Sequence, residues 1–125
     1  MLKYLFLALI PVFIGFVFSL LRPRPAVQLL AASQALQKLN AGAVLLDVRE
    51  PGEFAAGHVR GAVNVPLAEL RERAPAIAPD KDAPVLVCCA TGRRSADAAA
   101  RLAKMGYTDV SDCGGMDQWP YPLER

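Results

Sequence analysis

The chain has 125 residues and a formal net charge of +2, with 54% hydrophobic and 21% charged residues. This length allows one domain of ordinary size. The composition excludes a disordered or collagen-like chain, and the small net charge argues against a nucleic-acid binder driven by a basic surface. Three Cys cannot form the even-numbered framework of a secreted disulfide scaffold. A single His and the lack of spaced thiol pairs argue against a zinc site, so neither a metal nor a cofactor is predicted.

The first predicted element is an uncharged, strongly apolar run of 18 residues from Tyr4 to Leu21. A helix of that length spans roughly 27 Å, close to the ~30 Å hydrocarbon core of a bilayer. The run therefore predicts a retained transmembrane helix, with residues 1–25 as anchor and short spacer and residues 26–125 as the folded domain. The alternative is a cleaved secretory signal, but the apolar core of a signal is usually only about 7–15 residues and small residues follow it promptly.

The charges flanking this run predict its orientation. Lys3 precedes the run, whereas Arg22 and Arg24 follow it closely. The positive-inside rule then favours a single-pass membrane protein whose domain lies in the cytoplasm. A cleaved signal would instead make the domain secreted or periplasmic.

Strand and helix signals alternate through the rest of the chain. Short apolar runs predict strands at residues 27–30, 44–48, 62–65, 85–88 and 110–113. Helices are predicted at residues 33–39, 67–74 and about 93–105, with one helical turn at 51–56. Pro75 is expected to end the second of these helices and Gly106 the third. This alternation predicts an α/β domain with a mostly parallel sheet and helices on both faces.

The residues that suggest chemistry follow the strand at 85–88. A Cys at the carboxyl end of a central strand, just before a helix, lies where α/β folds place their sites. Backbone N–H groups of the turn, the helix N-terminus and the side chains of Arg93 and Arg94 all favour an anion there. Gly92 allows the positive φ that such a turn often needs. The pattern predicts an activated cysteine, largely thiolate, in an anion-binding cradle.

Two cysteines compete for this role. Counting from Cys88 gives Cys88-x5-Arg94, the spacing of cysteine phosphatases, whose seven-residue loop wraps a phosphate. Counting from Cys89 gives a six-residue loop that ends at Arg94, and a tighter pocket suited to one terminal sulfur. The spacing leaves both interpretations open.

Three segments, residues 45–67, 85–95 and 109–119, resemble the signature regions of the rhodanese family. The resemblance implies a small α/β domain with a central parallel sheet of about five strands. It implies a sulfurtransferase that moves sulfane sulfur from a donor such as thiosulfate to a thiophilic acceptor, which is cyanide, a thiol or a protein cysteine. It also assigns the persulfide-forming nucleophile to Cys89 and substrate binding to the rest of the loop: Ala90, Thr91, Gly92, Arg93 and Arg94.

Ala90 departs from this family, because many relatives carry a basic residue after the nucleophile. Arg93 is the candidate to replace that charge. Asp47 and Arg49 are expected to form a buried pair that braces the loop. The expected partners are a small sulfur-containing anion, an acceptor protein thiol and the membrane, with no nucleic acid.

Two other functions fit the same residues. One is a phosphatase or arsenate reductase that uses Cys88. The other is a non-catalytic, membrane-tethered module that only binds a partner.

Overall fold

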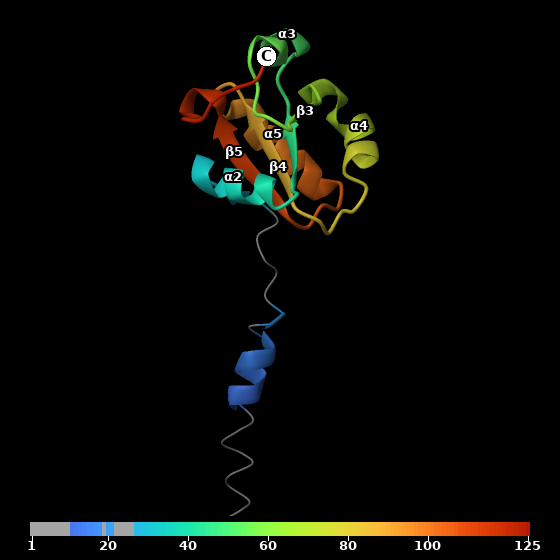
Figure 1. Ribbon diagram of the computed structural model, residues 1–125. Helices are drawn as coiled ribbons and strands as arrows, with labels where there is room; N and C mark the ends of the chain where they lie inside the picture. Colours follow the sequence, from blue (N-terminus) through green and yellow to red (C-terminus); the bar gives the residue numbers. More distant parts are fainter. Residues whose placement is uncertain (1–10, 19, 22–26) are drawn as a thin grey trace, which may run out of the picture.

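The computed structural model describes residues 11–18, 20–21 and 27–125 (Figure 1). Residues 11–18 are helical, and the Leu21 N–H donates to the Val17 carbonyl at 3.0 Å. Within the described residues, no helix combines the length and the apolar character needed to cross a bilayer. Residues 4–10 and 19 of the predicted span lie outside the described part, as does the predicted domain boundary at residues 25–26.

Apolar side chains of the N-terminal segment are exposed. Between 60% and 73% of the surface is exposed for seven of them: Val12, Phe13, Ile14, Phe16, Phe18, Leu20 and Leu21. These side chains therefore form no part of the hydrophobic core of the domain.

A single parallel sheet organises the described domain. Its strands are β1 (Val27–Leu29), β2 (Val44–Asp47), β3 (Val63–Asn64), β4 (Val85–Cys89) and β5 (Val110–Gly115), in the order β1-β5-β4-β2-β3. Every neighbouring pair is parallel. All residues of the central strand β4 are buried, as a continuous apolar run predicts for a strand covered on both faces. The predicted five-stranded parallel sheet is confirmed.

Helices cover both faces of this sheet (Figure 1). They are α2 (Ala32–Asn40), α3 (Pro51–Ala56), α4 (Leu70–Ile77) and α5 (Arg93–Lys104), with 3-10 turns η1 (Leu67–Glu69) and η2 (Met116–Gln118). One core lies under α4 and α5, where Leu70 and Leu102 are fully buried. The core on the other face contains Leu86, and Leu39 of α2 packs against it.

Helix α4 differs from its prediction. It spans Leu70–Ile77, so Pro75 lies inside it, and the prediction that Pro75 ends the helix is wrong. Proline removes one backbone hydrogen bond from a helix, a loss that packing can offset. Here Ala74 is fully buried and accepts the Ala78 N–H at 2.8 Å, while the Ala78 carbonyl accepts the Tyr107 hydroxyl at 2.7 Å. These contacts stabilise the last turn of α4, which follows the proline.

Helix α5 agrees closely with its predicted range of 93–105. Its buried stripe includes Ala98 and Leu102, and Gly106 follows its end with φ of +99°. On the exposed face the Arg101 Nε lies 3.0 Å from the Asp97 Oδ1. Strand β5 is longer than predicted, because it continues through Gly115 instead of ending at residue 113.

Candidate active site

The candidate loop connects the central strand to α5 at the carboxyl edge of the sheet. Cys89 is the last residue of β4, and Gly92 immediately precedes α5 with φ of +100° and ψ of −11°. That left-handed conformation favours glycine, which has no Cβ to clash with the backbone. The residue turns the chain from strand to helix within three positions.

The Cys89 thiol lies beneath this turn. Its side chain is fully buried, and the Gly92 N–H donates to its Sγ at 3.0 Å. Helix geometry leaves the N–H groups of the first turn of α5 without intrahelical acceptors, and the positive end of the helix dipole lies there. The strand, the glycine turn and the helix start therefore place the Cys89 sulfur next to a backbone N–H donor at the N-terminus of α5.

The loop residues differ in exposure. Thr91 and Arg93 are exposed to solvent, whereas Ala90, Gly92 and Arg94 are half-buried. Arg93, the predicted substitute for a charge at position 90, lies at the first position of α5.

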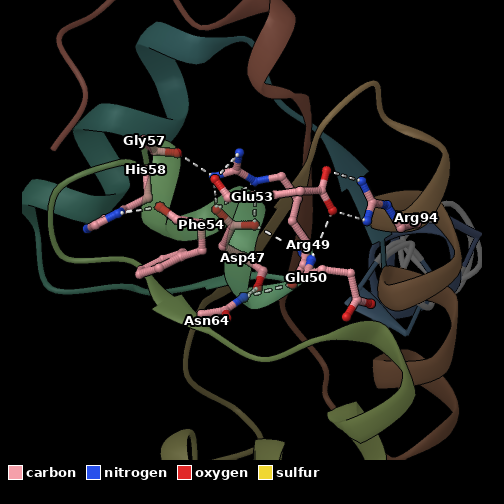
Figure 2. Close-up of polar contacts among 9 residues, drawn as sticks. All are labelled: Asp47, Arg49, Glu50, Glu53, Phe54, Gly57, His58, Asn64 and Arg94. Carbon is pink, nitrogen blue, oxygen red and sulfur yellow. Dashed lines mark hydrogen bonds and ion pairs between the residues drawn. The ribbon is translucent and has the colours of Figure 1, made fainter. Parts of the chain in front are cut away.

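Arg94 is held by a residue that the sequence analysis did not identify. Its Nη1 and Nη2 atoms lie 2.7 and 2.9 Å from the two carboxylate oxygens of Glu53, on α3 (Figure 2). Both side chains are about one-third exposed, at 32% for Arg94 and 37% for Glu53. The Arg94 guanidinium lowers the pKa of Glu53 from 4.5 to about 2, and the Glu53 carboxylate raises the pKa of Arg94. Glu53 thus fixes the guanidinium beside the loop and neutralises much of its charge.

The predicted Asp47–Arg49 pair is present and buried. Arg49 Nη2 lies 2.7 Å from Asp47 Oδ2, and the same nitrogen donates to the Gly57 carbonyl at 2.7 Å. Arg49 Nη1 also donates to the Glu53 carbonyl at 3.3 Å. The pair therefore braces α3, and through Glu53 it supports the Arg94 side of the loop (Figure 2).

His58, the single His, is part of the same scaffold. Its Nδ1 lies 2.9 Å from the Phe54 carbonyl, and its ring stacks on the Phe54 ring with centroids 3.8 Å apart. Figure 2 shows it on the side of α3 away from Arg94.

Cys88 lies on the opposite face of the sheet from Cys89. It is buried with Leu45, Leu86 and Val59, in the core against which α2 packs. Burial raises its pKa well above 9.0, and the nearby Asp47 carboxylate raises it further. This environment favours a neutral thiol.

Cys113 is a third thiol packed against the same core as Cys88. Burial raises its pKa to about 12. Within the described part of the chain, no three His, Cys, Asp or Glu side chains come together as a set of metal ligands.

The end of β5 packs against the candidate loop. A Cβ atom on Gly115 would lie 2.5 Å from the Ala90 carbonyl oxygen and 2.6 Å from the Thr91 Cα. The Asp117 N–H, from η2, donates to the same Ala90 carbonyl at 3.2 Å. The predicted strand ended at residue 113, so the sequence did not indicate this contact of the Gly114–Gly115 pair. Its small size was the available signal that two backbones approach closely there.

Known proteins are similar to this chain in sequence and in fold. Residues 31–120 match the rhodanese-like domain family. The chain is 43% identical over 77 residues to the thiosulfate sulfurtransferase PspE of Escherichia coli, covering 62% of this chain and 74% of that protein. It is also 43% identical over 98 residues to the thiosulfate sulfurtransferase GlpE of Pseudomonas putida, covering 73% of this chain and 84% of that protein.

Solved structures give the same result. A rhodanese from Escherichia coli with bound anions superimposes with a TM-score of 0.64 at 39% identity, covering 67% of this chain and 99% of the other. The human single-domain sulfurtransferase TSTD1 superimposes with a TM-score of 0.64 at 27% identity, covering 72% and 92%. These relatives support the classification of the protein as a rhodanese-type sulfurtransferase. The chain belongs to the rhodanese-like domain family.

Proposed function

We propose that this protein moves sulfane sulfur from a small sulfur-containing anion to a thiophilic acceptor through a persulfide on Cys89. The observation that carries the proposal is the 3.0 Å contact from the Gly92 N–H to the Cys89 Sγ at the start of α5. A thiolate and a persulfide are both anions, so the same donors stabilise the nucleophile and the intermediate. Cys88, with its raised pKa on the other face of the sheet, has neither advantage.

Sulfur transfer occurs in two displacements that need no outside oxidant or reductant. The Cys89 thiolate attacks the outer sulfur of the donor, and a bond forms between Sγ and that sulfur. The bond from the outer sulfur to the rest of the donor breaks, and its electron pair leaves with the departing anion. An acceptor such as cyanide, a thiol or a protein cysteine then attacks the outer sulfur of the persulfide and restores the thiolate.

The loop residues have distinct roles in this proposal. Ala90, Thr91 and Gly92 contribute main-chain groups around the sulfur. Arg93, exposed at the first position of α5, attracts the anionic donor. Arg94 orients the helix side of the loop through its pair with Glu53.

Thiocyanate formation from thiosulfate and cyanide tests this function in the full-length protein. We expect activity in the wild type and in Cys88→Ser, and none in Cys89→Ser. Aryl phosphate hydrolysis that disappears in Cys88→Ser would establish the phosphatase function instead. Binding of a partner without either activity would favour the non-catalytic module.

We also propose that residues 4–21 anchor the protein in a membrane, with the domain on the cytoplasmic side. The length of the uncharged run supports this, as do the exposed apolar side chains at its described positions. Arg22 and Arg24 support the orientation. A cytoplasmic location also suits a working thiol, because that compartment is reducing.

Carbonate extraction tests the anchor, and cysteine labelling of intact cells tests its orientation. Glu72→Cys places a thiol at an exposed position of α4, and Lys3→Cys places one on the other side of the apolar run. With a membrane-impermeant maleimide, we expect labelling of Lys3→Cys but not of Glu72→Cys until the cells are lysed. The opposite pattern would reverse the orientation, and extraction of the protein by carbonate would exclude the anchor.

A further inference from the structure

The candidate loop is flanked by more carboxylates than guanidinium groups. Arg93 and Arg94 are the cations of its helix side. Glu53 binds Arg94 through both carboxylate oxygens, so most of that positive charge is compensated before any substrate arrives. Arg93 is then the cation available to an incoming anion.

Two further carboxylates lie close to this pair and to the loop. The Glu50 N–H donates to Glu53 Oε1 at 3.0 Å, and the Glu50 carboxylate adds to the electrostatic stabilisation of the Arg94 cation. The Asp117 N–H is bonded to the Ala90 carbonyl, and the Asp117 carboxylate lies beside Gly115, where the loop and β5 touch. Glu50 immediately precedes α3, and Figure 2 shows the Glu53 carboxylate facing Arg94.

The sum of these charges is negative. Arg93 and Arg94 contribute two positive charges, and Glu50, Glu53 and Asp117 contribute three negative ones. The buried Asp47–Arg49 pair adds no net charge, because its two members cancel.

Two further residues near the loop, Asp112 and Ala90, add no positive charge. Asp112, buried within β5, accepts the Gly114 N–H at 2.9 Å and adds one more negative charge. Ala90 supplies no cation at the position after the nucleophile. The helix dipole and the main-chain N–H groups oppose this negative charge with roughly half a positive charge.

From this balance we propose that the site selects its sulfur donor by charge, preferring monoanionic sulfane-sulfur donors to the dianion thiosulfate. The inference rests on the sulfurtransferase function proposed above and names the class of its donor. Thiosulfonates and thiol persulfides belong to this class, since each carries a single negative charge on its sulfur-bearing group. A dianion carries one more negative charge, so the same carboxylates repel it more strongly.

The chemical step is the same for both kinds of donor. The Cys89 thiolate bonds to the outer sulfur, the bond between the two donor sulfurs breaks, and the electron pair leaves with the departing group. That group is sulfite from thiosulfate, a sulfinate from a thiosulfonate and a thiolate from a thiol persulfide. Charge selection therefore acts on approach and binding without altering the balance of the reaction.

Thiosulfate and methanethiosulfonate are matched probes, because both present an outer sulfur bonded to a sulfonyl group and differ by one charge. We expect Asp117→Asn to raise kcat/KM for thiosulfate about twofold more than kcat/KM for methanethiosulfonate at low salt. An effect of this size is expected when one unit charge acts over roughly 10 Å in water. The double variant Glu50→Gln with Asp117→Asn should raise this ratio about fourfold. Added salt should raise the wild-type ratio of thiosulfate to methanethiosulfonate activity by screening the repulsion.

Asp80→Asn is the matched control, because it removes the same charge before the start of β4, at the opposite end of that strand. It keeps an oxygen that can accept the Asp82 N–H, and it should leave the donor ratio unchanged. A ratio that does not rise in the double variant, or that falls with salt, overturns charge selection. If neither donor yields thiocyanate with the wild type, the sulfurtransferase proposal itself fails, which is a distinct result.

Discussion

At the scale of single residues, the least predictable contact is the one between Glu53 and Arg94. The two residues are 41 positions apart, and no periodicity or motif spacing relates them. Asp47 and Arg49, two positions apart beside a buried strand, were predictable as a pair. What the sequence did not indicate is that Arg49 reaches α3, since that depends on how the chain folds back after β2.

Replacing Glu53 by Gln should weaken the domain in a pH-dependent way. The pKa of Glu53 is lowered from 4.5 to about 2, so its ionised form stabilises the folded state above pH 4.5 and this contribution is lost as the pH falls toward 2. Because the pair is partly exposed, we expect Glu53→Gln to cost about 0.5–1 kcal/mol of unfolding free energy at neutral pH. The difference should shrink in acid.

Urea titrations of the wild type and Glu53→Gln, followed by Trp119 fluorescence at several pH values, measure this effect. The same titration of the exposed neighbour Glu50→Gln is the control, with a smaller expected change. A Glu53→Gln deficit that stays constant from neutral to acid pH would contradict the assigned ion pair.

Asp47→Asn should be far more damaging than its small change in shape suggests. The variant leaves the buried Arg49 guanidinium without its counter-charge, and removal of one partner of a buried pair costs about 3–5 kcal/mol. Asp97→Asn, which breaks the exposed pair with Arg101, should cost only about 0.2–0.5 kcal/mol. Equal urea midpoints for the two variants would show that the Asp47–Arg49 pair does not stabilise the fold.

At the scale of elements, sequence patterns predicted the strands and most helices, because each is a local consequence of apolar spacing. The prediction failed where a distant contact overrides a local signal. Pro75 lies within α4 because buried Ala74 and the Tyr107 hydroxyl hold the last turn. Strand β5 extends to Gly115 because it pairs with Cys89 of β4, a register that the sequence alone does not supply.

The contact between the end of β5 and the candidate loop yields an element-scale prediction. Gly115→Ala would place a Cβ against the Ala90 carbonyl and the Thr91 backbone, so the loop must shift to accept it. We expect sulfur transfer to fall at least about 10-fold, since even small displacements of reacting groups can cost ~100-fold.

Gly52→Ala is the control for that experiment, because its Cβ would meet no atom within 4 Å. Circular dichroism should remain native in both variants, and thiocyanate assays should separate them. Wild-type activity in Gly115→Ala would mean that the loop tolerates a displaced backbone.

At the scale of the whole molecule, the domain buries its apolar side chains, whereas the described apolar side chains of the N-terminal segment are exposed. Helices cover both faces of the parallel sheet, and the loop after β4 lies at the carboxyl edge of that sheet. Sequence patterns predicted that location, because a Cys after the central strand of an α/β fold has few other places to lie. The charge around the loop was not predictable, since it depends on carboxylates from α3 and η2 that only the folded chain brings together.

The central claim is that Cys89 carries the transferred sulfur, and tandem mass spectrometry of the donor-treated protein tests it most directly. Cleavage after Lys81 and Arg93 gives one peptide with both Cys88 and Cys89, so fragmentation must separate the two positions. We predict the mass of one added sulfur on Cys89, its loss after cyanide treatment, and its persistence in Cys88→Ser. Added sulfur on Cys88, or its survival in Cys89→Ser, would contradict the account.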